Sequence, residues 1–114
     1  MLKDNIFQKI IDKQIRADIV HEDDQCVAFK DINAQAPTHV LIVPRKVIPT
    51  HADLTDDDRD LLGHLHLVAV KLARQLGLDD GYRIVIYCLD RGGQTVPHLH
   101  MHLMGGRDFH WPPG

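Results

Sequence analysis

The chain has 114 residues, the size of one domain, so we expect a single domain over residues 1–114. Hydrophobic residues make up 44% and charged residues 25% of the chain, a globular balance that argues against disorder. The 13 basic and 16 acidic side chains give a net charge of −3, which offers no general attraction for nucleic acid or anionic lipid.

The sequence also limits where the protein can act. Its longest unbroken apolar run, Ile84–Leu89, is too short to span a membrane. The start, Met1–Asp4, lacks the apolar segment of a secretory leader. Two cysteines, Cys26 and Cys88, cannot form an all-thiolate zinc site and favour a reduced, intracellular chain. We therefore expect a cytoplasmic protein with no membrane and no nucleic-acid partner.

The first half of the chain predicts one helix followed by three strands. Residues 4–14 carry apolar side chains at helical spacing after Asp4, a plausible N-cap. Two short apolar runs, Ile19–His21 and Cys26–Phe29, flank a polar stretch and indicate a β-hairpin. Thr38–Val43 is predicted to be the third strand.

The second half predicts a long helix and two more strands. Thr55 and Asp58 have the spacing of a capping box, an apolar stripe follows for four turns, and Gly77 is a natural stop. Tyr82–Leu89 is apolar on both faces, which predicts an inner strand. A glycine-rich loop then leads into a last strand from about Val96 to Met104.

This order of elements predicts the fold class. With hairpin-length gaps between several strands, we expect an α+β domain that has a five-stranded, mostly antiparallel sheet and two helices. The tail Gly105–Gly114 is too rich in glycine and proline to continue the sheet.

The last predicted strand carries an unusual histidine pattern. Three histidines alternate with three apolar residues: His98-Leu99-His100-Met101-His102-Leu103. Successive side chains of a strand point to opposite faces, so the apolar residues should face the core and the imidazoles should share the other face. Chance would seldom place histidine at each polar position of a strand, so this face predicts a function.

Zinc binding is one interpretation of the histidines, because imidazole is a frequent zinc ligand. At a rise of about 3.3 Å per residue, His98 and His102 lie roughly 13 Å apart along a strand and can hardly converge on one ion. Two of the three could still bind a metal together with His39 or His51. We expect no metal.

Nucleophilic and acid–base chemistry is the favoured interpretation. A neutral imidazole is a competent nucleophile toward phosphorus, and neighbouring histidines can orient it or protonate the departing group. Gly92 and Gly93 stand just before the histidines, where glycine lets backbone N–H groups approach an anion. Thr95 adds a hydroxyl that can donate to a phosphate oxygen. The loop and the histidines together predict a phosphoryl-transfer site.

These residues resemble a known family. The run His98–Met104 is similar to the histidine-triad signature, in which three histidines alternate with apolar residues. Further segments are similar to the Hint branch of that family, the histidine triad nucleotide-binding proteins: residues 6–11, 29–32, 35–39, 62–65, 81–83, Gly105–Arg107 and His110–Gly114. The resemblance covers nearly the whole chain.

The resemblance implies a purine nucleoside phosphoramidase, a hydrolase that cleaves the P–N bond of adenosine 5′-phosphoramidates to AMP and an amine. It implies that His100 forms a nucleotidyl-histidine intermediate and that His98 orients it. His102 and His39 would contact the phosphate and help to protonate the amine. It also implies a homodimer with one continuous sheet, and catalysis without a metal or other cofactor.

The resemblance implies a nucleotide pocket as well. Asp31 would accept from the ribose hydroxyls, and Trp111 in the tail would approach the site of the partner subunit. Apolar residues would wall the purine, and the loop before the histidines would hold the phosphate: Ile6, Phe7, Ile10, Phe29 and Ile32 for the former, and Gly93, Thr95 and Val96 for the latter.

The chain departs from the family pattern at Tyr87 and Val47, and two alternative functions stay open. Tyr87 stands where the family commonly has an asparagine near the ribose and phosphate, and Val47 stands where some relatives have a histidine. One alternative is a dinucleoside polyphosphate hydrolase, which the segment Gln94–Pro97 also resembles, although the ending Trp111–Gly114 argues against it. Another is a purine-nucleotide-binding protein without catalysis, since binding survives changes that lower a rate.

Overall fold

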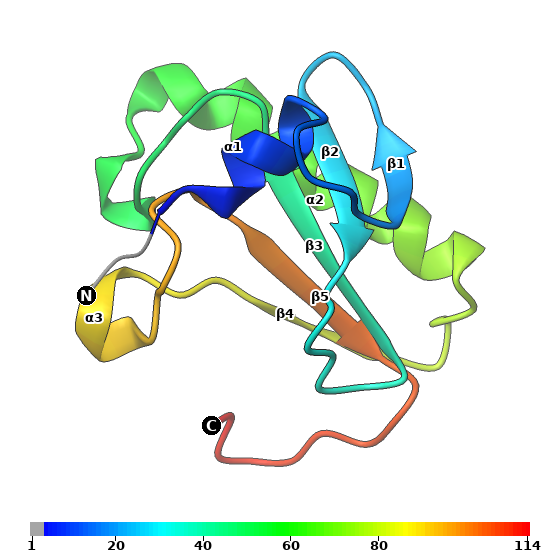
Figure 1. The fold of residues 1–114 in the computed structure, drawn as a ribbon. Coiled ribbons are helices and arrows are strands. Elements are labelled where there is room, and N and C mark those ends of the chain that lie inside the picture. Colours follow the sequence, from blue (N-terminus) through cyan, green and yellow to red (C-terminus); the bar gives the residue numbers. More distant parts are fainter. Residues whose placement is uncertain (1–3) are drawn as a thin grey trace.

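A five-stranded antiparallel sheet forms the centre of this computed structural model, which describes residues 4–114 (Figure 1). The strands lie in the order β1-β2-β3-β5-β4 and have these bounds: β1 Ile19–Glu22, β2 Cys26–Lys30, β3 Thr38–Pro44, β4 Tyr82–Val85 and β5 Met101–Gly105. The predicted α+β class and antiparallel sheet are confirmed. Residues 1–3, which make up most of the start where we expected no secretory leader, lie outside the described residues.

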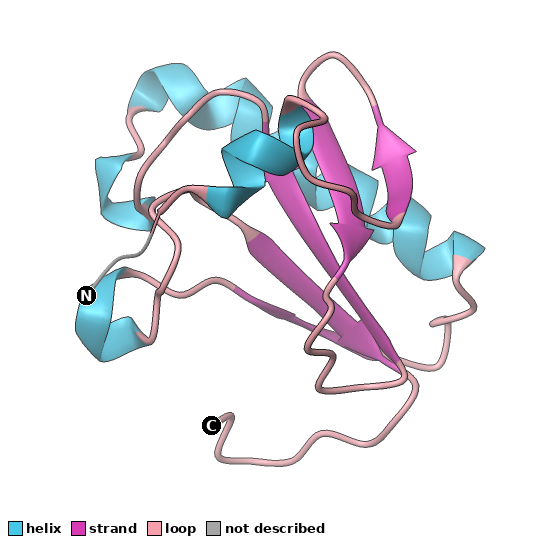
Figure 2. Cartoon of the chain, in the orientation of Figure 1, coloured by secondary structure: helices cyan, strands magenta, loops and turns pink. Residues whose placement is uncertain are grey.

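Helices cover both faces of this sheet (Figure 2). The helical elements are α1 Ile6–Ile11, α2 Arg59–Gln75, α3 Leu89–Gly92 and two 3-10 turns, His51–Asp53 and Asp56–Asp58. Three α-helices are therefore present among the described residues where two were predicted. The additional one, α3, is a single turn in the glycine-rich loop. No helix of residues 4–114 is long and apolar enough to cross a membrane.

The short helix α1 begins and ends inside the predicted range. Its N-cap is Asn5 rather than Asp4, since the Asn5 Oδ1 accepts from the backbone N–H of Gln8 at 3.0 Å. The helix stops at Ile11 because Lys13 has a positive φ of 63°, which a right-handed helix cannot contain. The loop that follows is thereby free to turn toward β1.

The long helix α2 agrees closely with its predicted signals. Thr55 and Asp58 form the predicted capping box, which stands at the 3-10 turn Asp56–Asp58 that leads directly into α2. In it, the Thr55 N–H donates to the Asp58 Oδ2 at 3.0 Å. Gly77 has the left-handed φ of 74° expected at a helix stop. The apolar stripe of α2 packs on one face of the sheet, against side chains that include Leu99, Met101 and Leu103. The predicted apolar side of the histidine segment is thus confirmed.

Replacing Leu65 of α2 with alanine is expected to lower the free energy of unfolding by about 2–5 kcal/mol, because the side chain is 1% exposed within this core. Leu67 offers a matched control on the same helix, since it is 69% exposed. Its replacement by alanine should change stability by no more than about 0.5 kcal/mol. Urea unfolding of both variants checks this, and equal losses would contradict the assignment of the core face.

Two strand predictions were wrong in extent or place. β4 ends at Val85 instead of Leu89 and pairs only with β5, so it is an edge strand of this chain and not an inner one. β5 begins at Met101 instead of Val96. Pro97 lacks a backbone N–H, and the next N–H groups bond outside the sheet pattern, that of Leu99 to the Ile48 carbonyl at 2.6 Å.

Candidate active site

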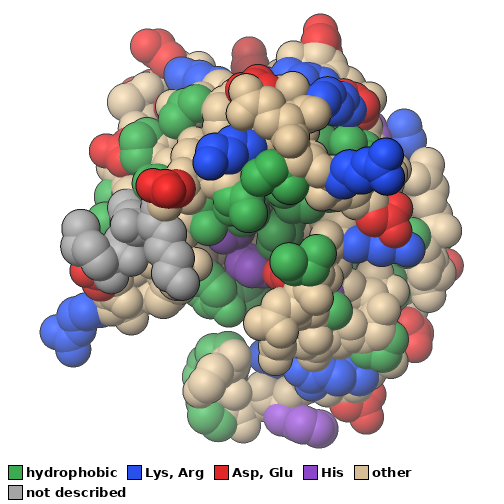
Figure 3. Space-filling model, in the orientation of Figure 1, with side chains coloured by type: hydrophobic (Ala, Val, Ile, Leu, Met, Phe, Trp, Pro, Cys, Tyr) green, Lys and Arg blue, Asp and Glu red, His purple; other side chains and the backbone are tan. Residues whose placement is uncertain are grey.

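A pocket of about 350 Å³ lies on the α1 side of the sheet. Figure 3 shows histidine atoms at the floor of a hollow bordered by hydrophobic side chains. Most of the residues predicted from the sequence line it: Ile6, Phe7, Ile10, Phe29, Asp31, Ile32, Tyr87, Gly93, Thr95, Val96, His100 and His102. The fold therefore brings together residues from four separate segments of the chain.

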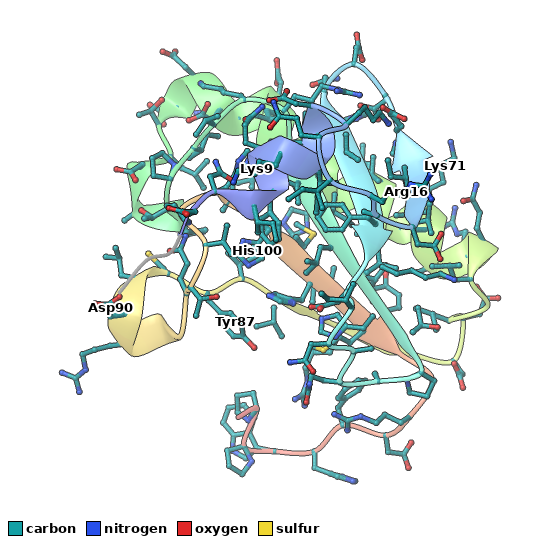
Figure 4. All side chains as sticks on the ribbon, in the orientation of Figure 1. Lys9, Arg16, Lys71, Tyr87, Asp90 and His100 are labelled. Carbon is teal, nitrogen blue, oxygen red and sulfur yellow. The ribbon has the colours of Figure 1, made fainter. Side chains whose placement is uncertain are left out.

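His100 lies at the floor of this pocket, just before β5. Figure 4 places it beside α1, and its ring meets the Phe7 ring edge-on with 4.7 Å between the centroids. Its Nδ1–H donates to the backbone carbonyl of His98 at 2.7 Å. Because the proton sits on Nδ1, the Nε2 at the other end of the ring carries a lone pair. This tautomer is the one that a nucleophilic imidazole requires.

His98 is fully buried and lies behind the pocket instead of lining it. Its Nε2–H donates to the Pro44 carbonyl at 2.7 Å, and its Nδ1 accepts from the side-chain amide of Asn5 at 3.0 Å. Both ring nitrogens are therefore satisfied. These bonds fix the His98 backbone, whose carbonyl holds His100, in agreement with the orienting role that the resemblance implies.

His102 and His39 form a directed hydrogen-bond chain. The backbone N–H of Gln35 donates to the His39 Nδ1 at 3.0 Å, so the proton of His39 must sit on Nε2. The His39 Nε2–H then donates to the His102 Nδ1 at 2.9 Å. The proton of His102 consequently sits on its own Nε2, which is buried without a hydrogen-bond partner among residues 4–114. Such an N–H is a donor prepared for a ligand.

Asp31 borders both this chain and the pocket. Its Oδ2 lies 3.4 Å from the His39 Nε2, and its Oδ1 accepts from the backbone N–H of Asn33 at 2.9 Å. One ligand atom each from Asp31, His39 and His102 lie within 4.8 Å of one another, so these residues could also hold a metal ion. The hydrogen bond between the two imidazoles would then have to open.

Burial keeps the histidines of the site neutral. Loss of solvation lowers the pKa of His98, His100 and His39 below the usual value, although the carbonyl bonds of His98 and His100 oppose it. For His102, burial and the neighbouring His100 and His39 lower the pKa to about 4. All four rings are therefore uncharged at neutral pH, and a neutral ring is the nucleophilic form.

These lowered pKa values predict a loss of stability in mild acid. An unfolded histidine titrates near about 6.5, so between that pH and the lower folded pKa the unfolded chain binds more protons. The free energy of unfolding should therefore fall as the pH falls from 7 to 5. Urea unfolding at each pH measures this. The free energy of unfolding should fall less steeply with pH in the variant His102→Gln. An equal dependence on pH in both proteins would contradict the contribution of His102.

Sequence reasoning missed the residues that support the site. Gln94 is buried; its side-chain amide donates to the carbonyls of Pro49 and Val96, and its Oε1 accepts from the Leu89 N–H at 2.9 Å. This fixes the glycine-rich loop. The hydrogen-bond partners of Asn5 and Gln94 cannot be predicted from a local sequence pattern. Asn5, for example, binds the ring of His98, which stands 93 positions away in the chain. Arg16 and Lys30 also line the pocket.

Three of the predicted site residues lie away from the pocket lining: His98, as described above, His39 and Trp111. His39 is buried beside His102 and contacts two residues that line the pocket, His102 and Asp31. Trp111 is 88% exposed on the tail, so its predicted contact with a partner subunit stays a prediction. Val47, at a position where some relatives have histidine, is also exposed. Tyr87 does line the pocket, with its ring 5.0 Å from that of His102.

Comparisons with known proteins agree with this arrangement. A model of the HIT domain matches residues 12–109. The purine nucleoside phosphoramidase of Escherichia coli is 48% identical over 108 residues, which are 94% of this chain and 91% of that protein. A HIT-like protein of Synechocystis is 54% identical over 114 residues, the full length of both.

The fold gives the same result. The crystal structure of a HIT family hydrolase from Legionella pneumophila has a TM-score of 0.94 at 49% identity and covers 96% of this chain and 98% of that one. The family model and these relatives span nearly the whole sequence, and the resemblance expected from the histidine run is confirmed. The chain belongs to the histidine triad, or HIT, domain family.

Proposed function

We propose that this protein hydrolyses the P–N bond of purine nucleoside 5′-phosphoramidates, releasing AMP and an amine from the adenosine compounds. The observation that carries the proposal is the pair of ring tautomers: a lone pair on the His100 Nε2 beside a partnerless N–H on the His102 Nε2. The 48% identity to the phosphoramidase of Escherichia coli supports the same substrate class.

In the first step, the His100 Nε2 forms a bond to phosphorus while the P–N bond breaks. The departing nitrogen takes the bonding electron pair, and it must also gain a proton because an amide anion is too basic to leave. The His102 Nε2–H supplies that proton. Loss of its Nε2 proton leaves His102 with a negative charge. The ring centroids of His100 and His102 are 5.1 Å apart, so the positive charge on the phosphorylated ring of His100 compensates this negative charge.

In the second step, water attacks the phosphorus of the nucleotidyl-histidine. The P–Nε2 bond breaks, its electron pair returns to His100, and the His102 Nε2 accepts a proton from the water. Both rings thereby regain their starting tautomers. The hydrogen bond from His39 keeps the His102 Nδ1 in the acceptor state throughout the cycle.

The remaining pocket suits a purine nucleoside. The rings of Phe7 and Phe29 meet edge-on, with 5.6 Å between their centroids. With the apolar side chains of α1 they form a wall against which a base can pack. Asp31 offers a carboxylate to ribose hydroxyls, and Thr95 offers a hydroxyl to the phosphate. We further propose a homodimer, in which the edge strand β4 and the exposed Trp111 find partners.

The proposal predicts that the purified protein converts adenosine 5′-phosphoramidate to AMP and ammonia without added metal. Turnover of a diadenosine polyphosphate under the same conditions should be much slower. Chromatography of the nucleotides measures both reactions. Faster cleavage of the polyphosphate would favour the dinucleoside polyphosphate hydrolase, and tight AMP binding without turnover of either compound would favour a nucleotide-binding protein.

A further inference from the structure

A second cluster of polar side chains lies on the α2 side of the sheet, away from the phosphoryl site. It is centred on Asp23 in the turn between β1 and β2. The Nε2 atoms of His21 and His64 lie 2.7 and 2.8 Å from the Asp23 Oδ2, and the Cys26 thiol donates to the same oxygen at 3.5 Å. Three different side chains therefore converge on one carboxylate oxygen.

The structural role of Asp23 does not account for this convergence. The Asp23 Oδ1 accepts from the backbone N–H groups of Gln25 and Cys26, both at 2.8 Å, and these two bonds form the turn. The turn thus uses Oδ1 alone. Oδ2 is left for two imidazoles and a thiol, and such a set of nitrogen, oxygen and sulfur atoms is a metal-ligand set.

The spacing of these atoms is close to that of a metal site. One ligand atom each from His21, Asp23 and Cys26 lie within 4.8 Å of one another. Ligands of a tetrahedral zinc ion, with bonds of about 2.0–2.3 Å, stand on the order of 3.5 Å apart. Movements of about 1 Å in these three side chains would therefore make room for an ion between them. His64 lies outside this group of three, with its Nε2 2.8 Å from the Asp23 Oδ2, and would move further to become the fourth ligand.

The cluster is also open to an incoming ion. The side chains of His21, Asp23 and His64 are 15%, 24% and 29% exposed, whereas Cys26 is fully buried beneath them. The nearby guanidinium of Arg45 is partly neutralised by Glu22, whose Oε2 lies 3.1 Å away. An ion could thus enter from solvent between the two imidazoles and meet the thiol at the floor.

We propose that His21, Asp23, Cys26 and His64 form a binding site for a divalent ion of the zinc class. The donor set of two imidazoles, one carboxylate and one thiol suits a borderline ion such as Zn²⁺ better than Mg²⁺ or Ca²⁺, which prefer oxygen. Bound there, the ion would join the β1–β2 hairpin to helix α2, because His64 belongs to α2 and the other ligands belong to the hairpin.

The protonation states of the ligands determine how many protons are released when the ion binds. Burial alone would raise the pKa of Asp23, but hydrogen bonds from His21, Gln25, His64 and Cys26 hold it well below its usual range, so the carboxylate is charged. Burial raises the pKa of the Cys26 thiol to about 12. The ion must therefore displace the thiol proton, while the Nε2 protons that His21 and His64 donate to Asp23 must move to their Nδ1 atoms, so one proton is released to solvent for each ion bound.

Titration of the reduced protein with Co²⁺ tests the site, because a cobalt–thiolate bond gives a near-ultraviolet charge-transfer band. We expect the band to saturate at one Co²⁺ per chain and to disappear when Zn²⁺ is added. The cluster of Asp31, His39 and His102 contains no sulfur and cannot give this band. Binding of Co²⁺ without the band would overturn the proposal.

Matched variants separate the ligands from their neighbours. Cys26→Ser should abolish the band, whereas Cys88→Ser should keep it, since Cys88 is the only other cysteine. His64→Gln should weaken Co²⁺ binding by about tenfold or more, and His66→Gln on the exposed part of the same helix should leave it unchanged. His64→Gln keeps the test decisive if Cys26→Ser fails to fold. A band that survives in a folded Cys26→Ser protein would refute the assignment.

Discussion

Replacing His100 with alanine is expected to lower the kcat for adenosine 5′-phosphoramidate by at least about 10⁴-fold. The variant lacks the nitrogen that bonds to phosphorus, and removal of a covalent nucleophile typically has an effect of this order or larger. AMP binding should change far less, because the aromatic and apolar pocket walls remain in place. Steady-state kinetics and AMP titration of the same preparation measure the two effects.

His66 provides the control for this experiment. It is exposed on α2, on the far side of the sheet from the pocket, so His66→Ala should retain full turnover. Circular dichroism of both variants checks that they fold. If a folded His100→Ala protein kept more than a few per cent of the activity, the nucleophile would have to be another residue.

Replacing His102 with glutamine is expected to have the second largest effect, about 10²- to 10⁴-fold on the kcat for a phosphoramidate. The partnerless Nε2–H of His102 is assigned to the departing nitrogen. A leaving group that needs no proton should therefore tolerate the change. We expect the p-nitrophenyl ester of AMP, which releases a stable phenolate, to lose no more than about tenfold in the rate of its first phenolate burst with this variant, because the burst precedes the attack of water that also uses His102.

The ratio of these two losses is the informative quantity. His102→Gln also removes a ring that packs against His100 and Tyr87, so a small loss common to both substrates is expected. Equal large losses for the amine and the phenolate would mean that His102 only positions the phosphate. Loss with the ester alone would contradict the proton-donor role.

Much of the site was predictable because it depends on local periodicity. The alternation over His98–Leu103 correctly placed Leu99, Met101 and Leu103 against the α2 core. It also correctly put His100 and His102 on the side of the pocket. The capping signal at Thr55 and the stop at Gly77 gave the long helix for the same reason: each depends on residues within a few positions.

The remainder depends on contacts between distant parts of the chain. The apolar run Tyr82–Leu89 predicted an inner strand, but only Tyr82–Val85 pair, and they lie at the edge, because strand order is fixed by tertiary pairing. His98 was expected on a strand face and is instead held behind the pocket by Asn5 and Pro44. The chain from Gln35 through His39 to His102 likewise has no local signature.

The most direct test of the phosphoryl chemistry is to quench the reaction within the first turnover and weigh the intact protein. The lone pair on the His100 Nε2 predicts an added mass of one nucleotide on each chain, mapping after digestion to the peptide that carries His100. The adduct should decay as AMP appears. An adduct on any other histidine, or rapid turnover with no adduct at any time, would contradict the account.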